Sequence, residues 1–256
     1  MSANYKGEGF FIKKGNKAVL LVHGFTASTQ EMESLALALA NKGYTVSVPL
    51  LAGHNMNLAV FKKTAVPAYM ESVFKAFDEL SAYETIDVVG LSFGATLALH
   101  LAACRSKVGK LVTLAPAVFY YNPLTKLLPF LRFYPGKVMK KMETNPKTGI
   151  KSRWDLFKPE AIAERIAYEW ITFPRLFDTQ RFMDLVKKEI SKLNNPILII
   201  HSKKDTTTKP QGAEFIFNNV ASNNKKLVWL ERSGHVITND YEADVVENEV
   251  VNFLAN

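Results

Sequence analysis

Short apolar runs alternate with amphipathic stretches along most of the chain. Six runs rich in large apolar residues occupy residues 19–22, 44–48, 86–89, 110–114, 197–200 and 227–230. Two of the intervening stretches, residues 32–42 and 69–80, are typical of crossover helices, and Val246, Val250 and Leu254 follow helical spacing near the end. This alternation predicts an α/β fold with a mostly parallel sheet and helices on both faces.

The alternation stops between residues 119 and 192, where no strand-like run occurs. Helical patterns continue there, for example Ile162, Ile166 and Trp170 at positions i, i+4 and i+8. The segment also holds 13 of the 29 aromatic residues of the chain, more than a surface cover requires. We therefore predict a core formed by residues 1–118 and 193–256, and a small helical cap at residues 119–192 that covers an apolar site.

Length and composition indicate one large domain with an insertion. A chain of 256 residues with 48% hydrophobic content can bury a sizeable core. The N-terminus lacks a signal-peptide pattern and no apolar run approaches the ~18 residues of a membrane span, so we expect a soluble, cytoplasmic protein. The single cysteine, Cys104, excludes an internal disulfide and is expected to be a buried small hydrophobe.

The net charge of +8 is unevenly distributed. Residues 119–192 contain 15 Lys and Arg against 8 Asp and Glu, whereas the rest of the chain has 17 against 16. The segment has no nucleic-acid motif, and its basic residues are scattered among aromatics, so we interpret it as a solvated basic face and expect no nucleic-acid partner. Weak contact of this basic cap with an anionic membrane surface is the alternative.

A G-x-S-x-G motif at residues 90–94 lies where a predicted strand turns into a predicted helix. This is the context of a nucleophile elbow, in which the turn holds the serine in strained backbone geometry with its hydroxyl exposed. Small residues must flank the serine because the strand and the helix approach closely. The motif therefore indicates Ser92 as a nucleophile, although the same pattern alone also occurs at ordinary tight turns.

A serine nucleophile needs a base and an acid that orients the base, and in this architecture they follow in the order Ser, Asp or Glu, His. Asp205 follows the run at residues 197–200, and His235 follows the run at residues 227–230. Both lie beyond carboxyl ends of strands, where sites in open parallel sheets form. Asp240 and Glu231 are rival partners for His235, and Asp205 has the alternative role of a turn former before a helix that begins at Pro210.

Acyl transfer also requires hydrogen-bond donors for the oxyanion. In an elbow enzyme, one donor is the backbone N–H after the nucleophile, here that of Phe93, and the other comes from the loop after an early strand, here most plausibly that of Phe25. Of the other histidines, His23 is expected to make structural hydrogen bonds and His201 to be buried beside a strand end. No pair has the spacing of a metal site, so we expect no metal.

Five segments spread along the chain form a recognisable set: HGFT at residues 23–26, GH at residues 53–54, GLSFG at residues 90–94, Asp205, and SGHVIT at residues 233–238. Together they resemble the α/β-hydrolase superfamily, and more narrowly the small bacterial carboxylesterases and monoacylglycerol lipases. The resemblance implies ester hydrolysis through an acyl-enzyme, a small helical cap and no cofactor. It also implies that Ser92 is the nucleophile, His235 the base and Asp205 its orienter.

The sequence thus predicts a serine carboxylic-ester hydrolase that acts on apolar esters of short to medium chain length, with monoacylglycerols as candidates. Two alternatives remain at this stage. A thioesterase or acyltransferase would use the same triad, and the basic cap suits a phosphate-bearing thioester. A ligand-binding protein without catalysis would share the fold but usually lacks a triad member.

Overall fold

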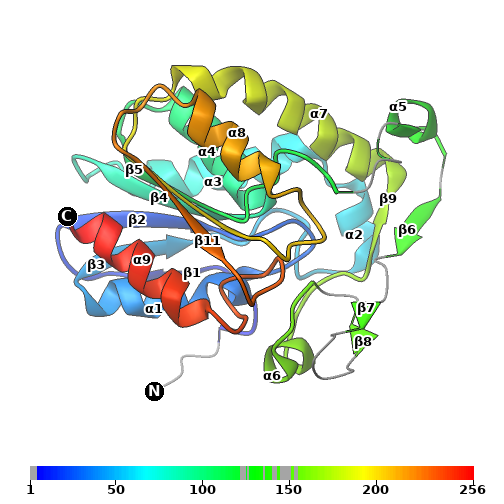
Figure 1. Ribbon diagram of the computed structural model, residues 1–256, viewed down its shortest axis with the longest axis horizontal. Coiled ribbons are helices and arrows are strands. Elements are labelled where there is room, and N and C mark those ends of the chain that lie inside the picture. The colour runs from blue at the N-terminus through cyan, green and yellow to red at the C-terminus, as the bar shows by residue number, and fades with distance from the viewer. Residues whose placement is uncertain are drawn as a thin grey trace.

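A seven-stranded sheet forms the centre of the protein (Figure 1). The computed structural model describes residues 5–121, 125, 127–134, 136–139, 143–144, 151–152 and 155–256. The strand order is β1-β3-β2-β4-β5-β10-β11, and all neighbours are parallel except β1 and β3. The strands are β1 (Phe10–Ile12), β2 (Lys17–Val22), β3 (Tyr44–Val48), β4 (Ile86–Leu91), β5 (Val108–Leu114), β10 (Ile197–Ser202) and β11 (Lys225–Leu230).

Helices cover both faces of this sheet, as the sequence predicts. α1 (Glu33–Asn41) and α9 (Ala243–Ala255) pack on one face, and α3 (Val66–Asp78), α4 (Phe93–Cys104), α7 (Phe173–Glu189) and α8 (Gln211–Asn219) lie on the other (Figure 1). Successive residues of a strand face opposite sides of the sheet. Val19 and Leu21 of β2 therefore lie in the core on the face that α1 and α9 cover, whereas Leu20 and Val22 lie in the core on the other face. All six predicted strands are confirmed.

Two short elements of the main fold have no counterpart in the prediction. β1 has only three residues and pairs along the edge with β3, through Phe10 and Val48 among others, so its sequence is too short to show a period. α2 (Leu58–Lys63) is a short helix capped by the side chain of Asn57, which accepts a hydrogen bond from the Val60 N–H.

The segment at residues 119–192 differs from the prediction in two respects. It contains two small antiparallel sheets, one of β6 (Lys137–Met139) with β9 (Trp170–Thr172) and one of β7 (Glu143–Thr144) with β8 (Lys151–Ser152), so the expectation of no strand is wrong. The helices here are α5 (Leu128–Leu131), α6 (Pro159–Ala163) and α7.

The helical pattern from Ile162 to Trp170 is also not realised. α6 ends at Ala163, and Trp170 lies in β9. The chain between them is irregular because its backbone binds other segments: the Ile166 N–H donates to Gln30 Oε1 (2.9 Å), and the Tyr168 N–H donates to the Thr26 carbonyl (2.7 Å). Tertiary contacts thus override the local periodicity.

Two further observations bear on the sequence expectations. Cys104 is exposed rather than buried, because it is the last residue of α4, where the helix extends beyond the part that the core covers. Within the described residues, no helix combines the length and apolar character that are needed to cross a lipid bilayer.

Candidate active site

Ser92 occupies a strained turn between β4 and α4. Its φ is +57° and its ψ is −119°, a combination that L-residues rarely adopt. A Cβ on Gly90 would lie 2.3 Å from the Gly94 carbonyl oxygen, and a Cβ on Gly94 would lie 2.3 Å from the Val22 carbonyl oxygen. Both flanking glycines are therefore required for the close approach of strand and helix, as expected for an elbow.

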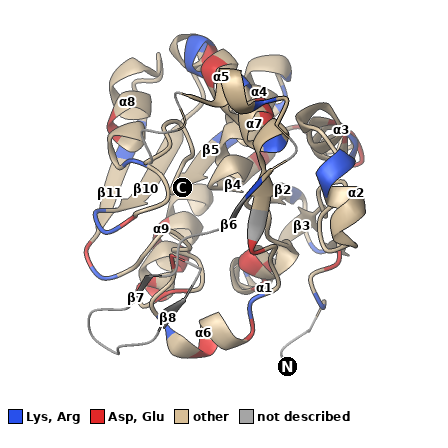
Figure 2. Ribbon diagram, turned by 90° about the vertical axis from the view of Figure 1, so that its right-hand side faces the viewer, with Lys and Arg blue, Asp and Glu red and all other residues tan. Residues whose placement is uncertain are grey.

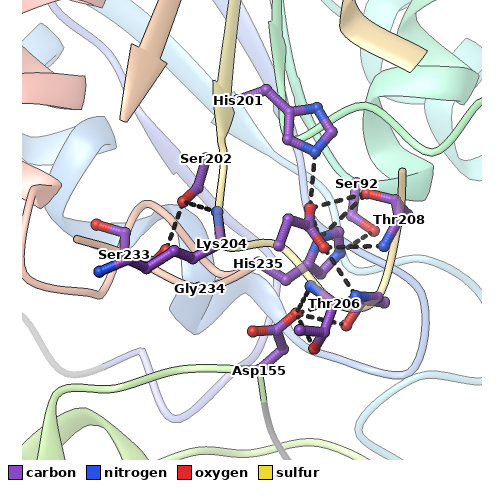
Figure 3. Close-up of polar contacts among 12 residues, drawn as sticks. Ser92, Asp155, His201, Ser202, Lys204, Thr206, Thr208, Ser233, Gly234 and His235 are labelled. Carbon is purple, nitrogen blue, oxygen red and sulfur yellow. Dashed lines mark hydrogen bonds and ion pairs between the residues drawn. The ribbon is translucent and has the colours of Figure 1, made fainter. Parts of the chain in front are cut away.

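The three loops that carry Ser92, Asp205 and His235 converge (Figure 3). His235 Nε2 lies 2.7 Å from Ser92 Oγ, and His235 Nδ1 lies 2.7 Å from Asp205 Oδ2. Since the Asp205 carboxylate accepts the Nδ1–H, the Nε2 lone pair is left to accept the serine proton. The structure thus brings the three predicted residues into one connected chain of hydrogen bonds.

Asp205 is 2% exposed, and its carboxylate accepts hydrogen bonds from several neighbouring residues. Besides His235, its Oδ2 binds His201 Nε2 (2.9 Å) and Thr208 Oγ1 (2.9 Å), while Oδ1 accepts the backbone N–H groups of Thr207 and Thr208. Burial alone would raise the pKa of this carboxyl, but the two histidines outweigh burial and hold the pKa well below its usual range. Asp205 therefore stays ionised.

The turn-former role considered for Asp205 is real, and it coexists with the contact to His235. The backbone N–H groups of Thr207 and Thr208 fold onto its Oδ1. α8 begins at Gln211, one residue after the predicted start at Pro210, and it has no side-chain cap; the Thr208 hydroxyl binds Asp205 instead. We call residues 203–208 the acid loop and residues 231–238 the histidine loop.

His235 is buried, and the neighbouring carboxylates change the pKa of its imidazole. Burial lowers the pKa of its imidazole, but the charges of Asp205, Asp155 and Glu31 together raise it above 6.5. The rival partners lie elsewhere: Glu231 forms an exposed ion pair with Lys203, and Asp240 accepts backbone N–H groups. Asp205 is therefore the carboxylate that contacts the His235 ring.

The loop at residues 23–27, here called the oxyanion loop, lies beside the elbow. A Cβ on Gly24 would lie 3.4 Å from Ser92 Cβ and 2.9 Å from Glu31 Oε2, so only glycine fits there. Among the described residues, the structure gives the backbone N–H groups of Phe25 and Phe93 no hydrogen-bond acceptor. The centroids of the Phe25 and Phe93 rings lie 5.8 Å apart.

Two histidines brace the oxyanion loop, as predicted for His23. The buried His23 ring accepts the Leu51 N–H at Nε2 (3.1 Å), and burial lowers its pKa, which favours the neutral ring. His54 Nε2 accepts the N–H of Thr26 (3.1 Å), a residue with φ of +69°. These bonds hold a strained loop in one conformation.

A buried ion pair adds a second brace that sequence reasoning missed. Glu31 binds the Arg165 guanidinium and also accepts the Gly24 N–H at 2.9 Å. Burial would raise the pKa of Glu31, but Arg165, the Gly24 N–H and His23 together outweigh burial and lower the pKa. Glu31 therefore remains ionised and connects the oxyanion loop to residues 155–168, a segment that we call the strap.

The strap also contacts the other two loops through Asp155, which sequence reasoning missed as well. Its Oδ2 accepts hydrogen bonds from the backbone N–H and the hydroxyl of both Thr206 and Thr207, at 2.6 to 3.1 Å. Its carbonyl oxygen accepts the His235 N–H at 2.8 Å. No spacing rule points to an aspartate in an insertion, so the sequence carried no signal for this contact.

Gly234 explains how the strap approaches the histidine loop. This glycine is buried, and a Cβ there would lie 2.5 Å from Asp155 Oδ1 and 2.6 Å from its carbonyl oxygen. The absent side chain leaves room for Asp155.

The described residues contain no group of three or more His, Cys, Asp or Glu side chains placed to hold a metal ion.

Comparison with known proteins adds the family to this geometry. The profile of the family described as "Serine aminopeptidase, S33" matches residues 13–242. The chain belongs to this S33 family. It is a serine hydrolase with the α/β-hydrolase fold, as the resemblance in the sequence implied.

Known relatives of this S33 family member align over nearly its whole length. The thermostable monoacylglycerol lipase of Bacillus sp. (strain H-257) is 31% identical over 249 residues, which cover 97% of this chain and 94% of the relative. The carboxylesterase of Bacillus subtilis (strain 168) is 29% identical over 253 residues, which cover 96% and 95%.

Solved structures of similar proteins share the fold. A structure described under LipS and LipT, two metagenome-derived lipolytic enzymes, matches with a TM-score of 0.85 and 25% identity over 97% of both chains. The monoacylglycerol lipase of Paleococcus ferrophilus matches with a TM-score of 0.78 and 20% identity over 96% of this chain and 98% of that one. The structural similarity therefore extends over nearly the whole chain.

Proposed function

We propose that this protein hydrolyses carboxylic esters of apolar acids through an acyl-enzyme on Ser92. The observation that carries the proposal is the relay of two 2.7 Å contacts from Ser92 to His235 and from His235 to Asp205. Two backbone N–H groups without a partner in the described structure, that of Phe25 in the oxyanion loop and that of Phe93 directly after Ser92, are the donors that we propose for the second requirement of acyl transfer.

The proposed reaction has two halves. In the first, His235 Nε2 takes the proton of Ser92 Oγ, which attacks the ester carbonyl carbon while the N–H groups of Phe25 and Phe93 bind the oxyanion. The intermediate then expels the alcohol, which receives the proton from His235. In the second half, His235 takes a proton from water, the hydroxide attacks the acyl-enzyme, and the acid leaves as Ser92 regains its proton.

The surroundings of the relay support an apolar acyl group. The Phe25 ring contacts those of Phe61, Tyr69 and Phe93 at centroid distances of 5.4, 6.0 and 5.8 Å. An aminopeptidase, which the family description names, needs a carboxylate for the substrate's ammonium group. The buried carboxylates of Glu31, Asp155 and Asp205 already accept hydrogen bonds within the protein, which favours esters over peptides.

Within esters, we propose monoacylglycerols as a substrate class, because one relative bears the name monoacylglycerol lipase and aligns over 97% of this chain. The experiment compares hydrolysis of monoacylglycerols, p-nitrophenyl esters, acyl-CoA and an amino-acid p-nitroanilide by the wild type and by Ser92→Ala. We expect ester turnover that the variant loses. Preference for acyl-CoA would indicate a thioesterase, and preference for the anilide would indicate a peptidase.

We further propose that an exposed aromatic cluster on the segment 119–192 touches a lipid surface. Phe130 and Phe133 are 82% and 80% exposed, and the Arg132 guanidinium lies 4.4 Å from the Phe133 ring centroid. The described helix α5 carries no charged side chain, and basic and acidic positions are intermingled on α7 (Figure 2), so aromatic rather than charged contacts should dominate. Phe130→Ser with Phe133→Ser should abolish co-sedimentation with anionic vesicles; unchanged co-sedimentation would contradict the proposed lipid contact.

The cytoplasmic location of the protein remains a prediction.

A further inference from the structure

Asp155 connects the two loops that carry the acid and the base. Its side chain accepts four hydrogen bonds from Thr206 and Thr207, the residues that directly follow Asp205. Its carbonyl oxygen accepts the N–H groups of His235 (2.8 Å) and Val236 (3.2 Å). One residue of the strap thus fixes the distance between two loops that are about 30 residues apart in the chain (Figure 3).

The Asp155 carboxyl is also an unusual group in its own right. It is 8% exposed, and within the described structure its Oδ1 has no hydrogen-bond partner. Buried polar atoms are normally paired, so an unpaired carboxylate oxygen beside the relay indicates an electrostatic role beyond packing. Burial, and then the Asp205 charge, raise the pKa of Asp155 to about 6.

We propose that Asp155 is a positioning residue for the proposed ester hydrolysis: it holds the acid loop and the histidine loop together, and its negative charge stabilises the protonated imidazole of His235. This inference rests on the proposed function. The protonated imidazole forms each time Ser92 loses its proton, so a second fixed negative charge near the ring favours that step. The described charged and titratable groups that face Asp155 and His235 are Asp205, His201 and Glu31, and Glu31 forms an ion pair with Arg165.

The test uses Asp155→Asn, which keeps the size and the acceptor oxygen for Thr206 and Thr207 but removes the charge. We expect kcat at about pH 8 to fall about 10- to 100-fold, a loss typical of small displacements in a catalytic relay, with KM nearly unchanged. The acidic limb of the pH profile of kcat/KM should move to lower pH, because the imidazole loses a charge that favours its protonation. Thermal stability at this pH should not fall, since the buried charge opposes folding there.

Asp240→Asn is the matched control. The Asp240 carboxylate is also buried, and it also joins the strap to the histidine loop, by accepting the N–H groups of Phe157 (3.0 Å), Lys158 (3.0 Å) and Gly234 (2.7 Å). Its neutralisation should lower stability and leave the midpoint of the acidic limb in place. If both variants leave that midpoint unchanged, or both move it equally, Asp155 has no special electrostatic role and the proposal is overturned.

A second variant and the wild-type assay separate the role of Asp155 from the proposed function. If Asp155→Asn does not fold, Thr206→Val removes one hydroxyl bond to Oδ2 from an exposed position, and we expect a few-fold loss of kcat with KM unchanged. An unchanged kcat would overturn the positioning role. If the wild type hydrolyses no ester at all, the proposed function fails; if it does and the variants behave like the wild type, only the role of Asp155 fails.

Discussion

The strand-end loops and the strap contribute to the same site in different ways. The loops after β4, β10 and β11 supply Ser92, Asp205 and His235, and these side chains contact one another directly. In the strap, Asp155 contacts the acid loop and the histidine loop, Tyr168 contacts the oxyanion loop, and Arg165 pairs with Glu31. The sheet thus places Ser92, Asp205 and His235 near one another, whereas the strap connects the loops and limits how far they can move.

The largest effect should come from the strand-end loops. His235→Ala removes the only imidazole within hydrogen-bond distance of Ser92 in the described structure, and we expect kcat on a p-nitrophenyl ester to fall about 10⁴-fold or more. His100→Ala is the matched control, because His100 pairs with Glu189 on α7. It should retain turnover within about threefold. Comparable losses in both variants would contradict the assignment of the base.

Asp205→Asn tests the acid in the same comparison. The amide can still accept the N–H groups of Thr207 and Thr208, so the acid loop should keep its shape. It cannot stabilise the imidazolium as a carboxylate does, and we expect a loss of kcat of about 10³- to 10⁴-fold. Circular dichroism should match the wild type. Activity close to that of the wild type would show that another carboxylate serves His235.

A smaller effect on turnover and a larger one on stability should come from the strap. Arg165→Met leaves the buried Glu31 carboxylate without its cation, and breaking such a pair costs about 3 kcal/mol of unfolding free energy. For a chain of this size, that corresponds to a fall in Tm of about 6 to 12 °C by calorimetry. An unchanged Tm would mean that the strap is not held by this pair.

The smallest effect is a shift along the pH axis. The imidazole of His235 must be neutral to accept the serine proton, so kcat/KM should fall as the pH drops through its pKa. Because the neighbouring carboxylates raise that pKa, the midpoint should lie above 6.5, the ordinary value for an imidazole. A midpoint below 6.5 in stopped-assay measurements would contradict the electrostatic account.

The sequence predicted the strand-end loops well for a physical reason. A buried parallel strand needs a continuous apolar run, and an elbow needs glycine on both sides of the serine, so both leave a local signature, as Gly90 and Gly94 show. The contact of Asp205 with His235 followed from the chain order that this architecture imposes. The order alone fixed which loops meet, without fixing their distances.

The strap could not be predicted in the same way. Its residues satisfy the backbone of other loops, as Tyr168 does for Thr26, and such contacts between distant segments leave no periodic pattern. Hydrophobic spacing instead suggested a helix through Ile166, where the structure has an irregular chain bound to Gln30. His201 offered a weak signal, since it is the second-last residue of β10 and lies four residues before Asp205, yet its bond to that carboxylate depends on how the loop turns back.

The most direct test of the central claim, that one relay activates Ser92, is labelling with a fluorophosphonate probe followed by peptide mapping. We predict a single adduct on Ser92 in the wild type, formed faster as the pH rises through the titration of His235, and almost none in His235→Ala. An adduct on another residue, or labelling of Ser92 at the same rate in both proteins, would contradict the account.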